Sequence, residues 1–234
     1  MFKKCVSSVL AFGMALSLGF SSFAGNVNAE QSDTVKGPAM QYEQMSKDFE
    51  EKTNVVSEKV ENTFTKLVEK NLADGKIKLE SLENNKLNLD DVVVRTLENG
   101  DYFVKVSTKG ENATETFSGF SAIFNQNKEL VSVFEVNLNE LDDDTAALKT
   151  WSNGQKVTDV VMEKPDVQPQ WSYSYFENCL SSQGVPWAAV AALGFICGAA
   201  CVGTGGAACA PCLYAGSSIS GGTIGYCLGK ALRQ

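Results

Sequence analysis

Among the 234 residues of this chain, six cysteines have the type and spacing of chemically functional residues. Thiols at such spacings form disulfides, bind zinc or act as redox groups. Six cysteines can pair into three disulfides in fifteen ways, so spacing alone leaves the connectivity open. We expect a disulfide framework made from Cys179, Cys197, Cys201, Cys209, Cys212 and Cys227.

The spacings nevertheless favour some bridges over others. Cys197 and Cys201 would lie on one face of a helix, so each would pair with a different segment. Cys179 and Cys227 stand near the two ends and would close the segment into one loop. Each long loop closed in this way contributes about 3–4 kcal/mol by restricting the unfolded chain.

Zinc and redox chemistry are the alternatives for these thiols. The C-x-x-x-C and C-x-x-C spacings resemble a zinc site, but zinc modules are usually reduced, intracellular and charged around the metal. The motif from Cys209 to Cys212 resembles a redox motif but lacks the strand-to-helix setting of thioredoxin. We therefore expect neither a metal site nor a cofactor.

The segment that carries these cysteines is apolar. It has no charged residue between Glu177 and Lys230. Trp187 follows Pro186 at the start of a helix-compatible run that includes Phe195 and Ile196, and tryptophan suits a membrane interface. We expect a mostly helical, membrane-active peptide.

Small residues recur every four positions near the end of this segment. Such a ridge lets two helices approach closely, in lipid or between disulfides. The spacing predicts at least two close-packed helices and leaves open whether they fold in water or only in lipid. The ridge consists of Ser217, Gly221, Gly225 and Gly229.

The first 29 residues have the pattern of a secretory signal peptide. Lys3 and Lys4 precede an apolar run, and Val27-Asn28-Ala29 ends it with small residues. We expect cleavage after Ala29, with Ser22-Phe23-Ala24 as a second possible site and an uncleaved anchor as the alternative. Removal of Cys5 leaves six cysteines, an even number, in a secreted chain.

Charge divides the rest of the chain into two parts. Residues 30–170 carry 27 acidic and 16 basic side chains, a net charge of −11, whereas residues 171–234 have a net charge of +1. An acidic surface argues against nucleic acid as a partner. Residues 164–173, with Pro165 and Pro169, form a linker where we expect a processing cut, before a cysteine-, glycine- and alanine-rich peptide of residues 174–234.

The sequence pattern of residues 30–163 predicts an α+β module. Apolar residues between Met40 and Leu72 recur at helical spacing, and from Ile77 the period changes to two. Asn99-Gly100 and Asn153-Gly154 are hairpin signals. We expect an N-terminal amphipathic helix on an antiparallel meander sheet of five or six strands, one of them spanning 114–124.

Catalysis has little support in the sequence. The chain has no histidine, which removes the Ser-His-Asp and Cys-His mechanisms and histidine metal ligands. The acidic run Asp142-Asp143-Asp144 lacks the ligand spacing of a calcium loop. We expect that the protein is not an enzyme.

The layout of signal peptide, acidic module and terminal peptide with Gly194-Phe195-Ile196-Cys197-Gly198 resembles the precursors of halocin-type (microhalocin-like) cysteine-rich bacteriocins. The resemblance covers Cys179 to Cys227 by motif and the whole chain by layout. It implies an antimicrobial peptide released from a precursor whose N-terminal part confers immunity by sequestering it.

These observations lead to one hypothesis and one alternative. The hypothesis is a secreted bacteriocin precursor whose disulfide-rich peptide acts on the membrane, or a membrane protein, of competing cells. Its partners would be export machinery, a processing protease and its own acidic module, which would act as an immunity factor or a chaperone. The alternative is an extracytoplasmic binding or stress protein anchored by an apolar helical hairpin.

Overall fold

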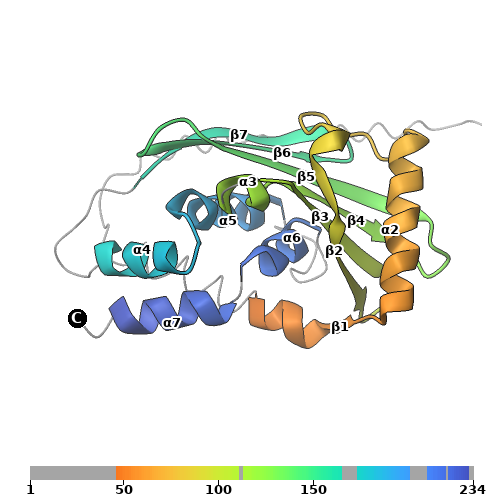
Figure 1. Ribbon diagram of the computed structural model, residues 1–234, viewed down its shortest axis with the longest axis horizontal. Coiled ribbons are helices and arrows are strands. Elements are labelled where there is room, and N and C mark those ends of the chain that lie inside the picture. The colour runs from red at the N-terminus through yellow and green to blue at the C-terminus, as the bar shows by residue number, and fades with distance from the viewer. Residues whose placement is uncertain (1–45, 111–112, 165–172, 201–209, 220, 232–234) are drawn as a thin grey trace, which may run out of the picture. The chain divides into compact units, whose positions relative to one another are not determined.

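The computed structural model describes residues 46–110, 113–164, 173–200, 210–219 and 221–231 (Figure 1). Its centre is a seven-stranded antiparallel sheet in which each strand pairs with the next along the chain. Helices precede, interrupt and follow the sheet, which confirms the α+β class. The strands are β1 (Thr53–Val55), β2 (Leu87–Leu97), β3 (Tyr102–Thr108), β4 (Gly119–Phe124), β5 (Leu130–Glu140), β6 (Thr145–Ser152) and β7 (Gln155–Glu163).

The helices fall into two groups along the chain. Helices α2 and α3 belong to the part before the linker, together with the helical residues 46–52 and a short 3-10 turn at Asn84–Lys86. Four follow the linker, where the sequence is poor in charge. The helices are α2 (Glu58–Ala73), α3 (Ala113–Phe117), α4 (Tyr173–Ser182), α5 (Trp187–Ala200), α6 (Ala210–Ser218) and α7 (Gly221–Ala231).

Both Asn-Gly pairs form the tight turns that the sequence predicts. Gly100 has φ +84° between β2 and β3, and its N–H donates to the carbonyl of Leu97. Between β6 and β7, Asn153 has φ +49° and Gly154 has φ +78°, the left-handed values that a two-residue hairpin requires. Local backbone preference therefore decides both hairpins.

The prediction of a single long helix before the sheet was wrong. Residues 46–52 are helical, β1 follows, and α2 begins at Glu58. The break falls at Thr53, whose hydroxyl donates to the carbonyl of Phe49 and accepts from Arg95 Nε at 2.8 Å. Pairing of β1 with β2 thus replaces one helical turn and adds a seventh strand.

The strand expected over residues 114–124 is shorter. Its first part forms α3, and β4 begins only at Gly119. The hydroxyl of Thr114 donates to Glu140, and the N–H of Ser118 donates to the carbonyl of Glu115, which closes the helical turn. A side-chain contact with β5 and a closed backbone turn thus replace strand pairing over these residues.

One face of the sheet, which we call the α2 face, packs against α2. Phe64 and Val68 of α2 are fully buried there against side chains that alternate along the strands. Such alternation with period two separates the two faces of every strand. The strand residues of this core are Leu87, Val92, Val94, Val104, Val106, Phe120, Ala122, Phe124 and Val133.

A buried carboxylate ties the segment after α2 to the same face. Glu135 of β5 is 2 % exposed, and its oxygens accept from the N–H groups of Glu80, Ser81 and Leu82 at 2.7–2.9 Å. The Ser81 hydroxyl donates a fourth hydrogen bond. These donors replace the water that the carboxylate loses on burial.

Replacement of Gly119 by alanine tests the start of β4. A Cβ at this position would lie 2.2 Å from the backbone oxygen of Val106, and the φ of +154° disfavours a side chain. We expect Gly119→Ala to lower the free energy of unfolding by about 1–3 kcal/mol, measured by urea denaturation.

Gly75→Ala is the matched control, because Gly75 also has a positive φ of +68° but faces open space. It carries only the conformational cost of about 1–2 kcal/mol. Equal stability of Gly119→Ala and the wild type would contradict the expected clash.

Candidate functional site

The opposite face of the sheet, which we call the α5 face, receives the helices that follow the linker (Figure 1). Its central part consists of Phe134, Val136 and Leu138 of β5, which alternate with the α2-face residues of the same strand. Ala146 and Leu148 of β6 continue it. The α5 face is the candidate functional site because it holds the apolar segment that the sequence singles out.

Helix α5 occupies this site with most of its described residues. Trp187, Leu193 and Ile196 are buried together with three alanines of the same helix. Burial of each large side chain contributes about 1.5–3 kcal/mol. Since α5 has no charged side chain, it depends on the sheet and on the neighbouring helices for cover.

Helix α6 contributes a fully buried tyrosine, Tyr214. The Tyr214 hydroxyl donates to the carbonyl of Phe117, and its ring packs edge-on against Phe117 and Phe134 at centroid distances of 6.2 and 5.9 Å. Burial raises the pKa of Tyr214. The hydroxyl therefore stays protonated and keeps its donor role in this apolar setting.

Lys105 of β3 lies under the same tyrosine. Its Nζ is 4.8 Å from the Tyr214 ring centroid and donates to the Ser218 hydroxyl at 2.8 Å. The residue is only 6 % exposed. Desolvation by burial lowers the pKa of Lys105 from 10.5 to about 7, against the opposing attraction of Asp91.

A second polar side chain faces the site from the next strand. Ser121 is paired directly with Lys105 across β3 and β4, which places both side chains on one face. Its hydroxyl is buried and has no hydrogen-bond partner among the described residues. The sheet beneath α6 is thus polar at one point within an otherwise apolar face.

The helical residues 46–52 close the site at the β2 end of the sheet. Phe49 packs edge-on against Phe103 at 5.6 Å, in a cluster that includes Leu213 of α6. The Ser46 hydroxyl donates to the carbonyl of Ile219 at 3.4 Å. A cleft of about 380 Å³ remains here, with Arg95, Glu50 and Ser217 among its lining residues.

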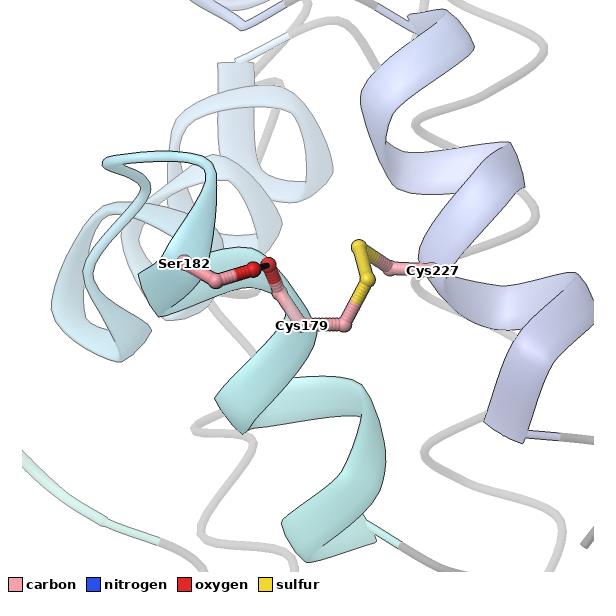
Figure 2. The surroundings of a disulfide bond; sticks show 3 residues. All are labelled: Cys179, Ser182 and Cys227. Carbon is pink, nitrogen blue, oxygen red and sulfur yellow. Dashed lines mark hydrogen bonds between the residues drawn. A yellow bond between two sulfur atoms is a disulfide. The ribbon is translucent and has the colours of Figure 1, made fainter.

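A disulfide joins the outer helices of the segment. Cys179 of α4 bonds to Cys227 of α7, with the Cα atoms 5.5 Å apart (Figure 2). The Ser182 hydroxyl donates to the Cys179 carbonyl at 2.7 Å and caps the end of α4. This is the loop-closing pair that the cysteine spacing suggested, and it spans a sequence separation of 48.

The other expected site residues are placed as follows. Cys197 lies in α5, Cys212 is half-buried on α6, and Cys201 and Cys209 lie outside the described residues. Phe195 is exposed on α5. Ser217 belongs to α6, whereas Gly221, Gly225 and Gly229 belong to α7, so the small-residue ridge does not run along one helix.

Two functional residues were missed by sequence reasoning, Lys105 and Tyr214. Lys105 stands in a strand of alternating pattern, in the sequence Phe103-Val104-Lys105-Val106, where a lysine on an apolar strand is the only signal. Tyr214 stands in an uncharged run among small residues. Neither signal names the partner, because the two residues are far apart in the chain.

The described part of the chain offers no cluster of three or more histidine, cysteine, aspartate or glutamate side chains that would hold a metal ion. Among the described helices, none is both long and apolar enough to cross a bilayer. Comparison of the chain with models of protein families, with curated proteins and with solved structures gave no match. The site must therefore be interpreted from its own geometry.

Replacement of Lys105 by methionine tests the polar point of the site. Between about pH 7 and pH 10.5 the unfolded chain binds a proton at Lys105 that the folded chain does not, so wild-type stability rises with pH over this window. We expect Lys105→Met to raise the thermal unfolding midpoint by several degrees at pH 7, and by less as the pH rises.

Lys149→Met is the control, since Lys149 is an exposed lysine of β6. We expect it to leave the midpoint nearly unchanged at every pH. A Lys105→Met variant that is less stable than the wild type at pH 7 would show that the contacts with Ser218 and Tyr214 outweigh the desolvation of the amine.

Removal of the disulfide tests its contribution to stability. For a loop of this length, restriction of the unfolded chain is worth about 4 kcal/mol. We expect the double variant Cys179→Ala/Cys227→Ala to lose about 3–4 kcal/mol of unfolding free energy, measured by chemical denaturation of the oxidised protein.

Ser182→Ala is the comparison variant, because it removes only the hydrogen bond to the Cys179 carbonyl. It should cost about 1 kcal/mol. A double cysteine variant as stable as Ser182→Ala would contradict the assigned role of the bridge.

Proposed function

We propose that this protein is an exported bacteriocin precursor. Residues 174–234 form the peptide that acts on the membrane of competing cells after a cut within residues 164–173, and residues 30–163 carry and mask it. The observation that carries the proposal is the burial of α5, a helix without a charged side chain, on the α5 face of the sheet.

The composition of α5 supports a membrane-directed role. A helix with no polar face is unstable in water when uncovered, because its apolar surface and backbone ends lose their protection. Lipid is the other environment that stabilises such a helix. With 14 residues, α5 is about 21 Å long, shorter than a bilayer core of about 30 Å, so insertion involves more than this helix alone.

The covalent organisation supports separation of the two parts. Residues 30–178 contain no cysteine, so no disulfide joins the sheet to the terminal segment. Contacts across the linker are apolar packing and a few hydrogen bonds, such as Lys105 to Ser218 and Tyr214 to Phe117. A single cut in the linker would therefore leave two chains held only by noncovalent contacts.

The same contacts support an immunity or chaperone role for residues 30–163. After the cut, the α5 face would still be complementary to the released peptide and would compete with lipid for it. This is the role that the resemblance to halocin-type precursors implies. Residues 30–163 in excess over the released peptide would therefore neutralise it, whereas dilution after the cut lets the peptide dissociate and reach the membrane.

The alternative, an extracytoplasmic protein anchored by these helices, has less support. An anchor would present its apolar helices to lipid while the sheet stayed in water. Here Trp187, Leu193 and Ile196 of α5 are buried in the core that the sheet shares with the terminal helices. Cell fractionation separates the two, because an anchored chain stays intact in the membrane pellet and a bacteriocin appears as a small peptide in the medium.

The decisive experiment compares the intact and the cut chain. A recognition sequence for a specific protease replaces part of residues 164–173 in the oxidised full-length protein. We expect the cut protein to inhibit growth of some strains in a bacterial panel and to cause dye leakage, and the intact protein to be at least about tenfold less active, because the α5 face masks the peptide.

The control is the unaltered chain treated with the same protease, which should remain inactive. A cut, oxidised preparation that inhibits no strain and releases no dye would contradict the proposed function.

A further inference from the structure

The exposed aromatic side chains of the described residues gather in the terminal segment. Tyr175 of α4 is 49 % exposed and Tyr226 of α7 is 53 % exposed, and Phe195 of α5 is also exposed. The large exposed apolar side chains of the sheet are instead valines, such as Val161. Tyrosine is stable at a membrane interface because its ring is apolar and its hydroxyl remains in water.

The two tyrosines border one recess between α4 and α7, which is also lined by Cys179 of the disulfide. Figure 2 shows that disulfide. The recess has a volume of about 430 Å³. Its other polar lining residues are Asn178, Ser182, Gln183 and Lys230, and among the side chains that the structure describes no carboxylate lines it. We call this surface the α4–α7 face.

Lys230 gives the α4–α7 face its charge. Its Nζ lies 4.7 Å from the ring centroid of Tyr226, so the ammonium group is held beside the aromatic ring while the residue stays exposed. A lysine ammonium attracts phosphate as a point charge, and amide N–H groups complete its hydrogen bonds. The lining of the recess therefore fits the phosphate of a lipid headgroup, with tyrosine rings at the level of the glycerol backbone.

The charge distribution along the chain selects the kind of lipid surface. Residues 30–170 have a net charge of −11 and are repelled by an anionic membrane, whereas residues 171–234 have a net charge of +1. The terminal segment is thus the part of the chain that an anionic bilayer can approach. Within it, the α4–α7 face combines the cation with two interfacial aromatic rings.

We propose that the α4–α7 face is a docking surface for the headgroups of anionic phospholipids. This inference rests on the proposed function and names its first partner. The face lies outside the packing of α5 on the sheet, so the intact precursor already presents it. Docking through α4 and α7 brings α5 to the lipid before α5 leaves the sheet.

The test is flotation of the intact, oxidised full-length protein with vesicles at physiological salt. Vesicles of equimolar phosphatidylglycerol and phosphatidylcholine should bind the protein more strongly than pure phosphatidylcholine. Lys230→Gln should lower the partition coefficient on the anionic vesicles about fivefold, the factor for one lysine near an anionic leaflet. The double variant Tyr175→Ser/Tyr226→Ser should lower it on both kinds of vesicle.

Two control variants match these changes elsewhere on the surface. Lys59→Gln removes one positive charge from a lysine of α2, and Val161→Ser removes an apolar side chain that is 64 % exposed on β7. Both should bind vesicles like the wild type. Equal binding of Lys230→Gln, the tyrosine variant and the wild type would overturn the proposal, as would absence of any preference for anionic vesicles.

Inorganic phosphate distinguishes a lipid surface from a simple phosphate site. In excess it should leave most of the vesicle binding intact, because the tyrosine rings require lipid. Complete displacement by phosphate would overturn the assignment to lipid. Growth inhibition by the cut protein is measured separately. If the protein does not bind the vesicles but the cut protein still inhibits growth, the α4–α7 face is rejected as the docking surface and the proposed function is retained.

Discussion

The packing of α5 on the sheet is the interaction on which the rest of the structure depends. A helix without a charged side chain needs cover on several sides, and the α5 face of β5 and β6 supplies one of them. Alternation along β5 makes this possible, since Phe134 and Val136 face α5 while Val133 and Glu135 face the other way. The sheet can therefore hold two separate cores, one with α2 and one with the terminal helices.

Polar groups define where the terminal helices dock. An apolar face alone permits several registers, because hydrophobic contact has little directionality. Directional hydrogen bonds allow fewer registers. Lys105 donates to Ser218, and Tyr214 donates to the Phe117 carbonyl. Desolvation of Lys105 lowers the stability of the folded chain at neutral pH. The same buried polar contact restricts the orientation of the terminal helices on the sheet.

Covalent and noncovalent contacts are divided along the chain in a way that suits a separable peptide. The Cys179–Cys227 bridge lies wholly within the terminal segment and holds α4 beside α7 whether or not the sheet is present. The sheet holds the same segment only through packing and hydrogen bonds. Loss of the sheet would uncover α5 but would leave the bridge between α4 and α7 in place.

The sequence by itself determined the features that depend on short windows. The Asn99-Gly100 and Asn153-Gly154 turns follow from the backbone conformations that these residues adopt, and the change from helical to alternating period marks the α+β class. The cysteine spacing suggested Cys179 and Cys227 as one possible pair. The uncharged run predicted apolar helices but not what would cover them.

Only the tertiary structure decided the contacts between distant residues. The break at Thr53 depends on Arg95, which is 42 residues away, and no local preference announces it. The small-residue ridge is divided between α6 and α7. The sequence did not predict this division, because a repeat of small residues does not show where a helix ends. Lys105 meets Ser218 across a separation of 113 residues. Such pairs form because the sheet brings β3 beneath α6, and burial then changes the chemistry of side chains that look ordinary in the sequence.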